Sequence, residues 1–124
     1  MLRTEDCYIH LRSRSFGRVG VKLAEELVVL PVFYAMFDED VVFRTSPGTK
    51  LDAAVLGTKV AFEIDDAGSG WSVLVTGHAE ELRHPDEQRR ARTNLGDEWP
   101  AGERDRVVRI RAEKVTGRRL HATS

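Results

Sequence analysis

The amino-acid sequence predicts a mainly β protein: a small antiparallel barrel of about six strands with two or three short helices outside it. Three observations favour this fold. Apolar and polar residues alternate in several segments, turn residues separate these segments at hairpin spacing, and a length of 124 residues suits one domain. We therefore expect residues 1–124 to form a single domain. An open antiparallel sheet covered by helices is the structural alternative.

The first half of the chain is expected to hold one helix and three strands. Thr4 is a candidate N-cap for a helix over about residues 4–13. The strands are expected at residues 19–23, 27–37 and 41–45. The segment Leu27–Phe37 is apolar nearly throughout, which indicates a strand covered on both sides. Pro31 within it indicates an edge position or a bulge.

The second half is expected to hold two helices and three further strands. A Ser-Pro-Gly turn precedes a short helix at Lys50–Leu56, and its packing side consists of Leu51, Ala54 and Val55. A second helix is expected over residues 85–95, with Pro85 near its start. Alternating apolar residues place the strands at 60–65, 71–79 and 108–113.

Charge and composition disfavour several classes of partner. Nineteen basic and twenty acidic residues give a formal net charge of -1, and the two signs are interleaved, so a nucleic-acid-binding face is not expected. The longest apolar run is too short to span a membrane. The single cysteine, Cys7, cannot form an intramolecular disulfide, which favours a reducing compartment, with the cytoplasm as the default.

No side-chain pattern of a metal site or of nucleophilic catalysis stands out. The four histidines are scattered over different predicted elements without a carboxylate at helical i, i+4 spacing, and we interpret all of them as structural: His10, His78, His84 and His121. Cys7 has no neighbouring base in the sequence. No residue is therefore assigned a catalytic role, and no metal is expected.

The segment Phe43–Lys50 is the most informative in the chain. A strand ends at Arg44 and Thr45, a tight turn follows, and a helix begins near Thr49, so two cations and several hydroxyls lie close together. This combination fits a phosphate-binding loop, although it has neither the Walker spacing nor the dinucleotide-binding glycine pattern. The alternative is a capped helix after a turn with two exposed charges, and spacing alone favours that alternative.

Several ordered segments resemble the pyridoxamine 5'-phosphate oxidase-like family, within it the short branch that includes nitroimidazole reductase-like proteins. The matching segments are PVFY from Pro31, VVFRTSPGTKL from Val41, VAFEID from Val60, WSVLVTG from Trp71, and the terminal LRSRSFGRVGV and VTGRRL. The similarity covers nearly the whole chain in order. It implies a six-stranded antiparallel split β-barrel with two or three short peripheral helices, and an FMN cofactor.

The resemblance also implies which residues bind the flavin. The cofactor phosphate would be held at Arg44, Thr45, Thr49 and Lys50, and the strand Val32–Tyr34 would run beside the isoalloxazine ring. A second subunit would contribute Trp71, Ser72 and Val73, which implies a homodimer with cofactor sites at its interface. The complete candidate set is Val32, Phe33, Tyr34, Phe43, Arg44, Thr45, Thr49, Lys50, Trp71, Ser72 and Val73.

Two departures argue against a true pyridoxamine phosphate oxidase. The oxidase ends in a segment whose arginine, histidine and tryptophan handle the vitamin phosphate and the flavin. Here Arg119 and His121 resemble that segment only superficially. Thr49 also replaces an arginine that is typical of the oxidase. The expected function is therefore an FMN-dependent oxidoreductase that moves a hydride to or from an unidentified small molecule.

Two other functions remain open at this point. A deazaflavin-dependent reductase would use the same phosphate site, and its acidic coenzyme tail would need a basic groove, for which Arg12, Arg14 and Arg18 are candidates by charge. A non-catalytic flavin-binding or storage module is the other. Without the resemblance, Trp71 is more typical of a core residue. Trp99, in a polar loop, is either a cap over a pocket or a surface packing residue.

Overall fold

The computed structural model describes residues 1–96 and 105–120. Its elements, in chain order, are α1 (Thr4–Ser13), β1 (Phe16–Leu23), β2 (Glu26–Phe37), β3 (Asp40–Thr45), α2 (Lys50–Val55), β4 (Lys59–Asp66), β5 (Trp71–Glu81), α3 (Pro85–Leu95) and β6 (Arg106–Arg119). The prediction of a mainly β fold with six antiparallel strands and short helices is confirmed. No described helix is long and apolar enough to cross a membrane.

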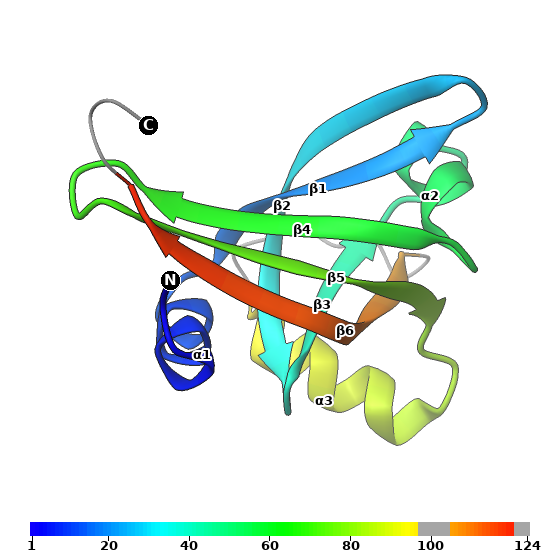
Figure 1. The fold of residues 1–124 in the computed structure, drawn as a ribbon. Coiled ribbons are helices and arrows are strands. Elements are labelled where there is room, and N and C mark those ends of the chain that lie inside the picture. Colours follow the sequence, from blue (N-terminus) through cyan, green and yellow to red (C-terminus); the bar gives the residue numbers. More distant parts are fainter. Residues whose placement is uncertain (97–104, 121–124) are drawn as a thin grey trace.

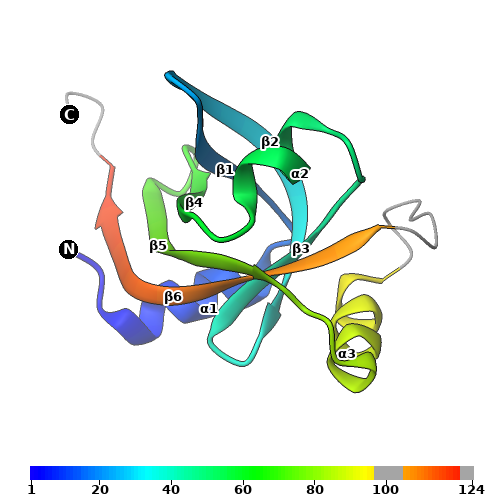
Figure 2. The same cartoon turned by 90° about the vertical axis from the view of Figure 1, so that its right-hand side faces the viewer.

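The six strands form a closed barrel in the order β1-β2-β3-β6-β5-β4 (Figure 1). Each pair of neighbours is antiparallel, and pairing of Arg18–Gly20 with Ala61–Glu63 closes the barrel between β1 and β4. Helices α1 and α3 lie against the outside of the barrel, and α2 follows β3 near the β1–β2 hairpin (Figure 2). The open-sheet alternative is therefore wrong, because hydrogen bonding between β1 and β4 leaves no free sheet edge there.

The apolar residues that alternate with polar ones in the sequence fill the interior of the barrel. Val60, Phe62 and Ile64 of β4 are at most 3% exposed, and they point inward together with alternate residues of β5. A second, smaller apolar cluster lies under α3: Phe37, Val42, Leu82, Ala91 and Val107. Helix α3 begins after His84, whose side chain accepts a hydrogen bond from Asp86 N, with Pro85 at its first position as predicted.

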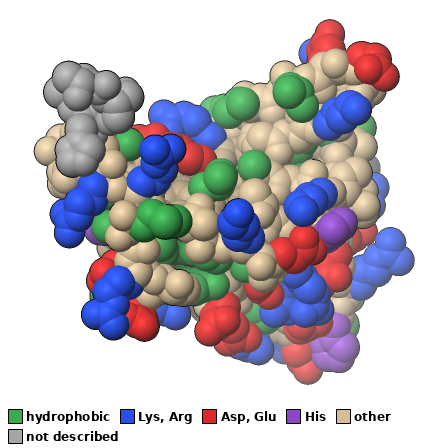
Figure 3. Space-filling model, in the orientation of Figure 1, with side chains coloured by type: hydrophobic (Ala, Val, Ile, Leu, Met, Phe, Trp, Pro, Cys, Tyr) green, Lys and Arg blue, Asp and Glu red, His purple; other side chains and the backbone are tan. Residues whose placement is uncertain are grey.

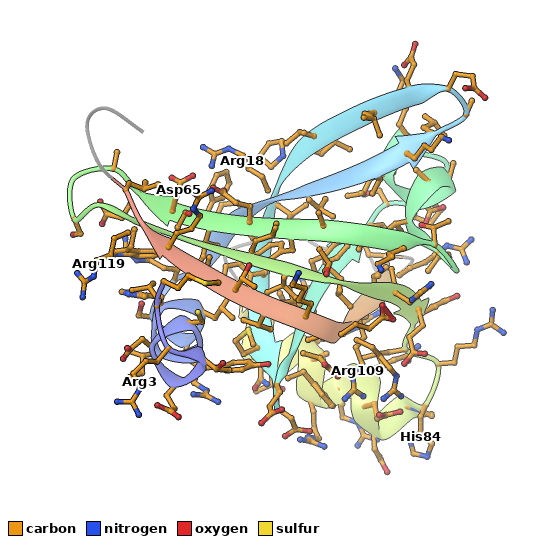
Figure 4. The ribbon with its side chains drawn as sticks, viewed as in Figure 1. Arg3, Arg18, Asp65, His84, Arg109 and Arg119 are labelled. Atoms are coloured by element: carbon orange, nitrogen blue, oxygen red, sulfur yellow. The ribbon has the colours of Figure 1, made fainter. Side chains whose placement is uncertain are left out.

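A partly buried ion pair joins β3 to β6 beside α3. The Arg109 Nε atom lies 2.7 Å from Asp40 Oδ2, and both side chains are less than 15% exposed. The Arg109 guanidinium also lies over the Phe37 ring, 5.0 Å from its centroid. Figure 4 shows Arg109 between β6 and α3. Arg109 Nη1 also lies 3.6 Å from Glu87 Oε2 of α3, which connects this ion pair to the helix that carries Leu95, a residue of the cavity described below.

The expectation that Leu27–Phe37 is covered on both sides is wrong for its first half. Leu27 is 84% exposed and Val29 is 66% exposed. The reason is that β3 pairs with β2 only from Tyr34 onward, so the β1–β2 hairpin extends beyond the barrel (Figure 1). Pro31 pairs with Arg18 of β1 and has no described partner strand on its other side, which confirms the predicted edge position.

Two element boundaries also differ from the prediction. Thr4 is the first residue of α1, and the N-cap is Arg3, which makes no side-chain capping bond. Strand β6 runs from Arg106 to Arg119, well beyond the expected 108–113, because it pairs along all of β5 across a bulge at Thr76/Gly77. A Cβ at Gly77 would overlap the Arg111 carbonyl oxygen, so this bulge requires glycine.

Two carboxylates and one arginine meet on the outer face of β1 and β4. The Arg18 Nη1 atom lies 3.4 Å from Glu63 Oε1 and 3.4 Å from Asp65 Oδ2, and Figure 4 shows Arg18 and Asp65 on this face. Desolvation by burial has the largest effect on the pKa of Glu63. Hydrogen bonding to Asp65 and repulsion from the Asp65 charge follow. Together they raise the pKa of Glu63 to about 7, against the smaller opposing effect of Arg18.

We expect Glu63→Gln to reduce the pH dependence of stability. Because the folded-state pKa is raised, the stabilising contribution is complete below the unfolded value of about 4.5 and is lost as pH rises through about 7. Melting temperatures measured at roughly pH 5 and pH 8 should therefore differ less in the variant than in the wild type. Glu80→Gln, at an exposed ion pair on β5, is the control. An unchanged pH dependence in Glu63→Gln would contradict the prediction.

Candidate functional site

A cavity of about 240 Å³ opens where β2 and β3 separate. Its lining combines apolar side chains from β2, α2 and α3 with the cations and hydroxyls of the β3–α2 turn. The lining residues are Leu30, Pro31, Val32, Phe33, Arg44, Thr45, Ser46, Thr49, Lys50, Leu51 and Leu95. The cavity therefore offers side chains suited to a flat apolar group together with side chains suited to an anion.

The structure brings six of the eleven predicted binding residues together in this cavity. These six are Val32, Phe33, Arg44, Thr45, Thr49 and Lys50. Tyr34 and Phe43 instead lie in the barrel interior, 2% and 0% exposed. The Tyr34 hydroxyl donates a 2.6 Å hydrogen bond to the Leu11 carbonyl, and burial raises the pKa of this phenol above its ordinary value. Their direct contact with a cofactor stays a prediction.

The three residues expected from a second subunit lie at the start of β5, outside this cavity. Trp71 is 6% exposed, and its ring stacks on His10 of α1 with 3.8 Å between centroids and 19° between planes. The Arg14 guanidinium lies 5.3 Å from the Trp71 ring centroid. Val73 is buried, and Ser72 is half-buried on the outer side of the strand. Their approach to a partner's cofactor stays a prediction.

The two threonines of the turn direct their hydroxyl protons to acceptors in the protein. Thr49 caps α2: its Oγ1 accepts from Asp52 N at 3.2 Å and donates to the Ser46 carbonyl at 2.8 Å. Thr45 is only 2% exposed, and its hydroxyl donates to Asp52 Oδ1 at 2.9 Å. The threonines thus order the turn, and Arg44 and Lys50 supply its positive charge within the cavity.

Asp52 and Arg106 are residues of this region that the sequence analysis missed. Asp52 Oδ2 accepts a hydrogen bond from Gly48 N at 3.3 Å, and Arg106 Nε lies 3.0 Å from Asp52 Oδ1. Gly48 has a φ of +82°, a left-handed conformation that favours glycine. The spacing Thr49-x-x-Asp52 is a capping-box pattern and would have indicated the aspartate. No local pattern indicates Arg106, which comes from a distant strand.

The arginines expected to form one basic groove lie in separate environments. Arg14 pairs with Asp66 at 2.8 Å, Arg18 pairs with Glu63, and Arg12 lies over the Tyr8 ring. Arg119 is exposed and pairs across the strands with Trp71. Trp99 and His121 lie outside the described residues. Among residues 1–96 and 105–120, no cluster of side chains could hold a metal ion.

A comparison with protein families covers almost the whole chain. Residues 3–119 match the family described as pyridoxamine 5'-phosphate oxidase. The chain belongs to this family. The resemblance stated from the ordered motifs is thereby confirmed, and the closed six-stranded barrel is the fold that it implied.

Individual proteins are similar to this chain in sequence or in structure. An uncharacterised protein of Mycobacterium tuberculosis is 37% identical over 123 residues, which cover 92% of this chain and 80% of the relative. The structure of the FAD binding protein from Mycobacterium smegmatis is 30% identical, with a TM-score of 0.87 and 96% of both chains covered. A candidate 5-nitroimidazole antibiotic resistance protein from Bacteroides thetaiotaomicron shares the fold, with a TM-score of 0.75 at 13% identity, over 94% of this chain and 84% of the other.

Proposed function

We propose that this protein binds FMN in the cavity between β2 and the β3–α2 turn and acts as an FMN-dependent oxidoreductase on a small molecule. The observation that carries the proposal is the combination of apolar side chains with two cations in the lining of one cavity. FMN has the same two parts, a planar ring system and a phosphate, so the side chains present fit it. The family assignment supports this choice over a bare helix cap.

In this proposal the chain binds, orients and shields the cofactor. Arg44 and Lys50 would hold the phosphate by charge-assisted hydrogen bonds, and the side chains of Leu30, Val32 and Leu95 would contact the ring. The bound flavin supplies hydride chemistry. No side chain of the described residues needs to act as an acid or a base.

We also propose that the protein resides in the reducing cytoplasm, because its single cysteine, Cys7, is free and buried.

We further propose that a second copy of the chain completes the site. A volume of about 240 Å³ is below the usual roughly 300–1,000 Å³ of a ligand site, so one chain offers only part of what a flavin nucleotide needs. Large apolar side chains are also exposed on outer strand surfaces: Phe16, Leu27, Val29 and Leu74. Figure 3 shows charges of both signs interspersed with apolar side chains on one face of the molecule. A homodimer would cover such side chains.

FAD is a second candidate cofactor, favoured by one specific observation. The similar structure from M. smegmatis is that of an FAD binding protein. FAD contains the same ring and a phosphate in the same relation, so Arg44 and Lys50 would serve both cofactors. The adenosine part would extend outside the cavity.

Purified protein should be yellow and should bind flavin stoichiometrically. We would record its visible spectrum and then titrate FMN, FAD and a deazaflavin coenzyme separately against tryptophan fluorescence. The ranking of the three affinities selects the cofactor. A nicotinamide donor then tests turnover: stoichiometric flavin without reduction or reoxidation would favour the storage module over the enzyme. A colourless preparation that binds none of the added cofactors would overturn the proposed function.

A further inference from the structure

We propose that Asp52 is a positioning residue for the phosphate-binding end of the cavity: it holds the two ends of the β3–α2 turn, and with them Arg44 and Lys50, in place for the anion. The inference rests on the proposed flavin function. Asp52 itself does not line the cavity, so it would act through its neighbours.

One carboxylate connects three separate parts of the chain. Its Oδ1 accepts from the hydroxyl of Thr45, the last residue of β3, at 2.9 Å. Its Oδ2 accepts from Gly48 N within the turn at 3.3 Å, and Arg106 Nε at the start of β6 lies 3.0 Å from Oδ1. The backbone N–H of Asp52 also donates to Thr49 Oγ1 at 3.2 Å. The turn is therefore fixed at both ends by this residue.

The hydrogen bond between Thr45 and Asp52 is shielded from water, so its loss has a cost. The Asp52 side chain is 11% exposed, and Thr45 is 2% exposed. A buried hydroxyl that loses its acceptor is not fully compensated by solvent. Removal of the carboxylate should therefore let the turn rearrange to satisfy this donor elsewhere.

A rearrangement of the turn would move the two cations, Arg44 and Lys50. Arg44 immediately precedes Thr45, and Lys50 immediately follows Thr49, so each cation is next to a residue that Asp52 holds. Anion sites bind more tightly when their donors are already placed, because ordering them on binding costs free energy. Asp52 would thus raise phosphate affinity without touching the phosphate.

Arg106 explains how an aspartate is tolerated close to an anion site. A lone carboxylate there would repel a phosphate, but Arg106 forms an ion pair with Asp52 and lies 3.4 Å from Glu81 Oε1 on the other side. The positive charge of Arg106 therefore offsets the negative charge of the Asp52 carboxylate, which also accepts hydrogen bonds from Thr45 and Gly48. This arrangement separates the hydrogen-bonding role of the carboxylate from its electrostatic cost.

The test compares FMN with riboflavin, which has the same ring and no phosphate. In Asp52→Ala, the Kd for FMN should rise by about tenfold or more, as is usual when a supporting residue is removed, while the Kd for riboflavin changes by less than about threefold. Asp52→Asn keeps one acceptor oxygen and should fall between wild type and alanine. Asp86→Ala, which removes an exposed aspartate paired with Arg89 in the first turn of α3, is the matched control and should change neither constant.

The ratio of the two constants separates positioning from general destabilisation. A variant that is merely less stable would lose affinity for both ligands equally, and the FMN preference would be retained. Such a retained preference in Asp52→Ala would overturn this inference and leave the proposed function intact. Wild-type protein that binds neither FMN nor riboflavin would instead overturn the proposed function, and this inference with it.

Discussion

Replacement of both Arg44 and Lys50 by alanine should lower FMN affinity by orders of magnitude, a far larger effect than its effect on the stability of the apo-protein. A charge-assisted hydrogen bond to phosphate contributes about 1.5–3 kcal/mol, so the loss of two should raise the Kd by roughly two to four orders of magnitude. Lys50 is exposed, so its replacement should change folding stability by under about 0.5 kcal/mol, whereas Arg44 is half-buried and its replacement should cost about 1 kcal/mol. Fluorescence titration and thermal melting measure the two quantities.

A matched pair of substitutions controls for lost positive charge. Lys59→Ala with Arg83→Ala removes the same two charges from exposed positions that do not line the cavity. This double variant should bind FMN with wild-type affinity at moderate salt, because distant surface charges are screened. Unchanged FMN affinity in the Arg44/Lys50 variant would show that the turn only caps α2, which is the alternative that spacing alone favoured.

The strand positions could be predicted because their environment is periodic. In β4, Val60, Phe62 and Ile64 face the barrel interior and their neighbours face outward, so alternation in the sequence reflects burial directly. The β2 segment was misjudged because apolar composition does not distinguish a covered strand from an exposed one. Leu27 and Val29 lie on a projecting hairpin, and their exposure depends on where β3 joins β2.

The cavity residues also divide into those that neighbouring sequence predicts and those that only the tertiary structure brings together. The 43–50 segment was recognised because its cations, hydroxyls and turn residues are adjacent in sequence, and four of its predicted residues line the cavity. Leu95 and Arg106 were missed because α3 and β6 bring them to the turn from distant parts of the chain. The roles of the threonines also depend on the three-dimensional structure, since the direction of a hydroxyl hydrogen bond depends on which acceptor is near.

Trp71→Ala should lower the free energy of unfolding of the apo-protein by about 3–5 kcal/mol, the usual effect of truncating a fully buried aromatic residue. The indole is 6% exposed and stacks on His10, so its removal leaves a cavity between β5 and α1. Urea denaturation measures the change. Ile9→Ala, on α1 but 61% exposed, is the control and should cost about 1 kcal/mol or less. Wild-type stability of Trp71→Ala would contradict the burial of the indole against α1 of its own chain.

The shared-site proposal adds an effect that core packing alone does not produce. If Trp71 also approaches the flavin of a partner, FMN binds only the dimer and must raise both the dimer fraction and the melting temperature by mass action. Sedimentation with and without FMN measures this linkage. Trp71→Phe keeps an aromatic ring against His10, so the folded variant should retain much of its stability while FMN-linked dimerisation weakens. A monomer that binds FMN stoichiometrically at low protein concentration would contradict a site built from two chains.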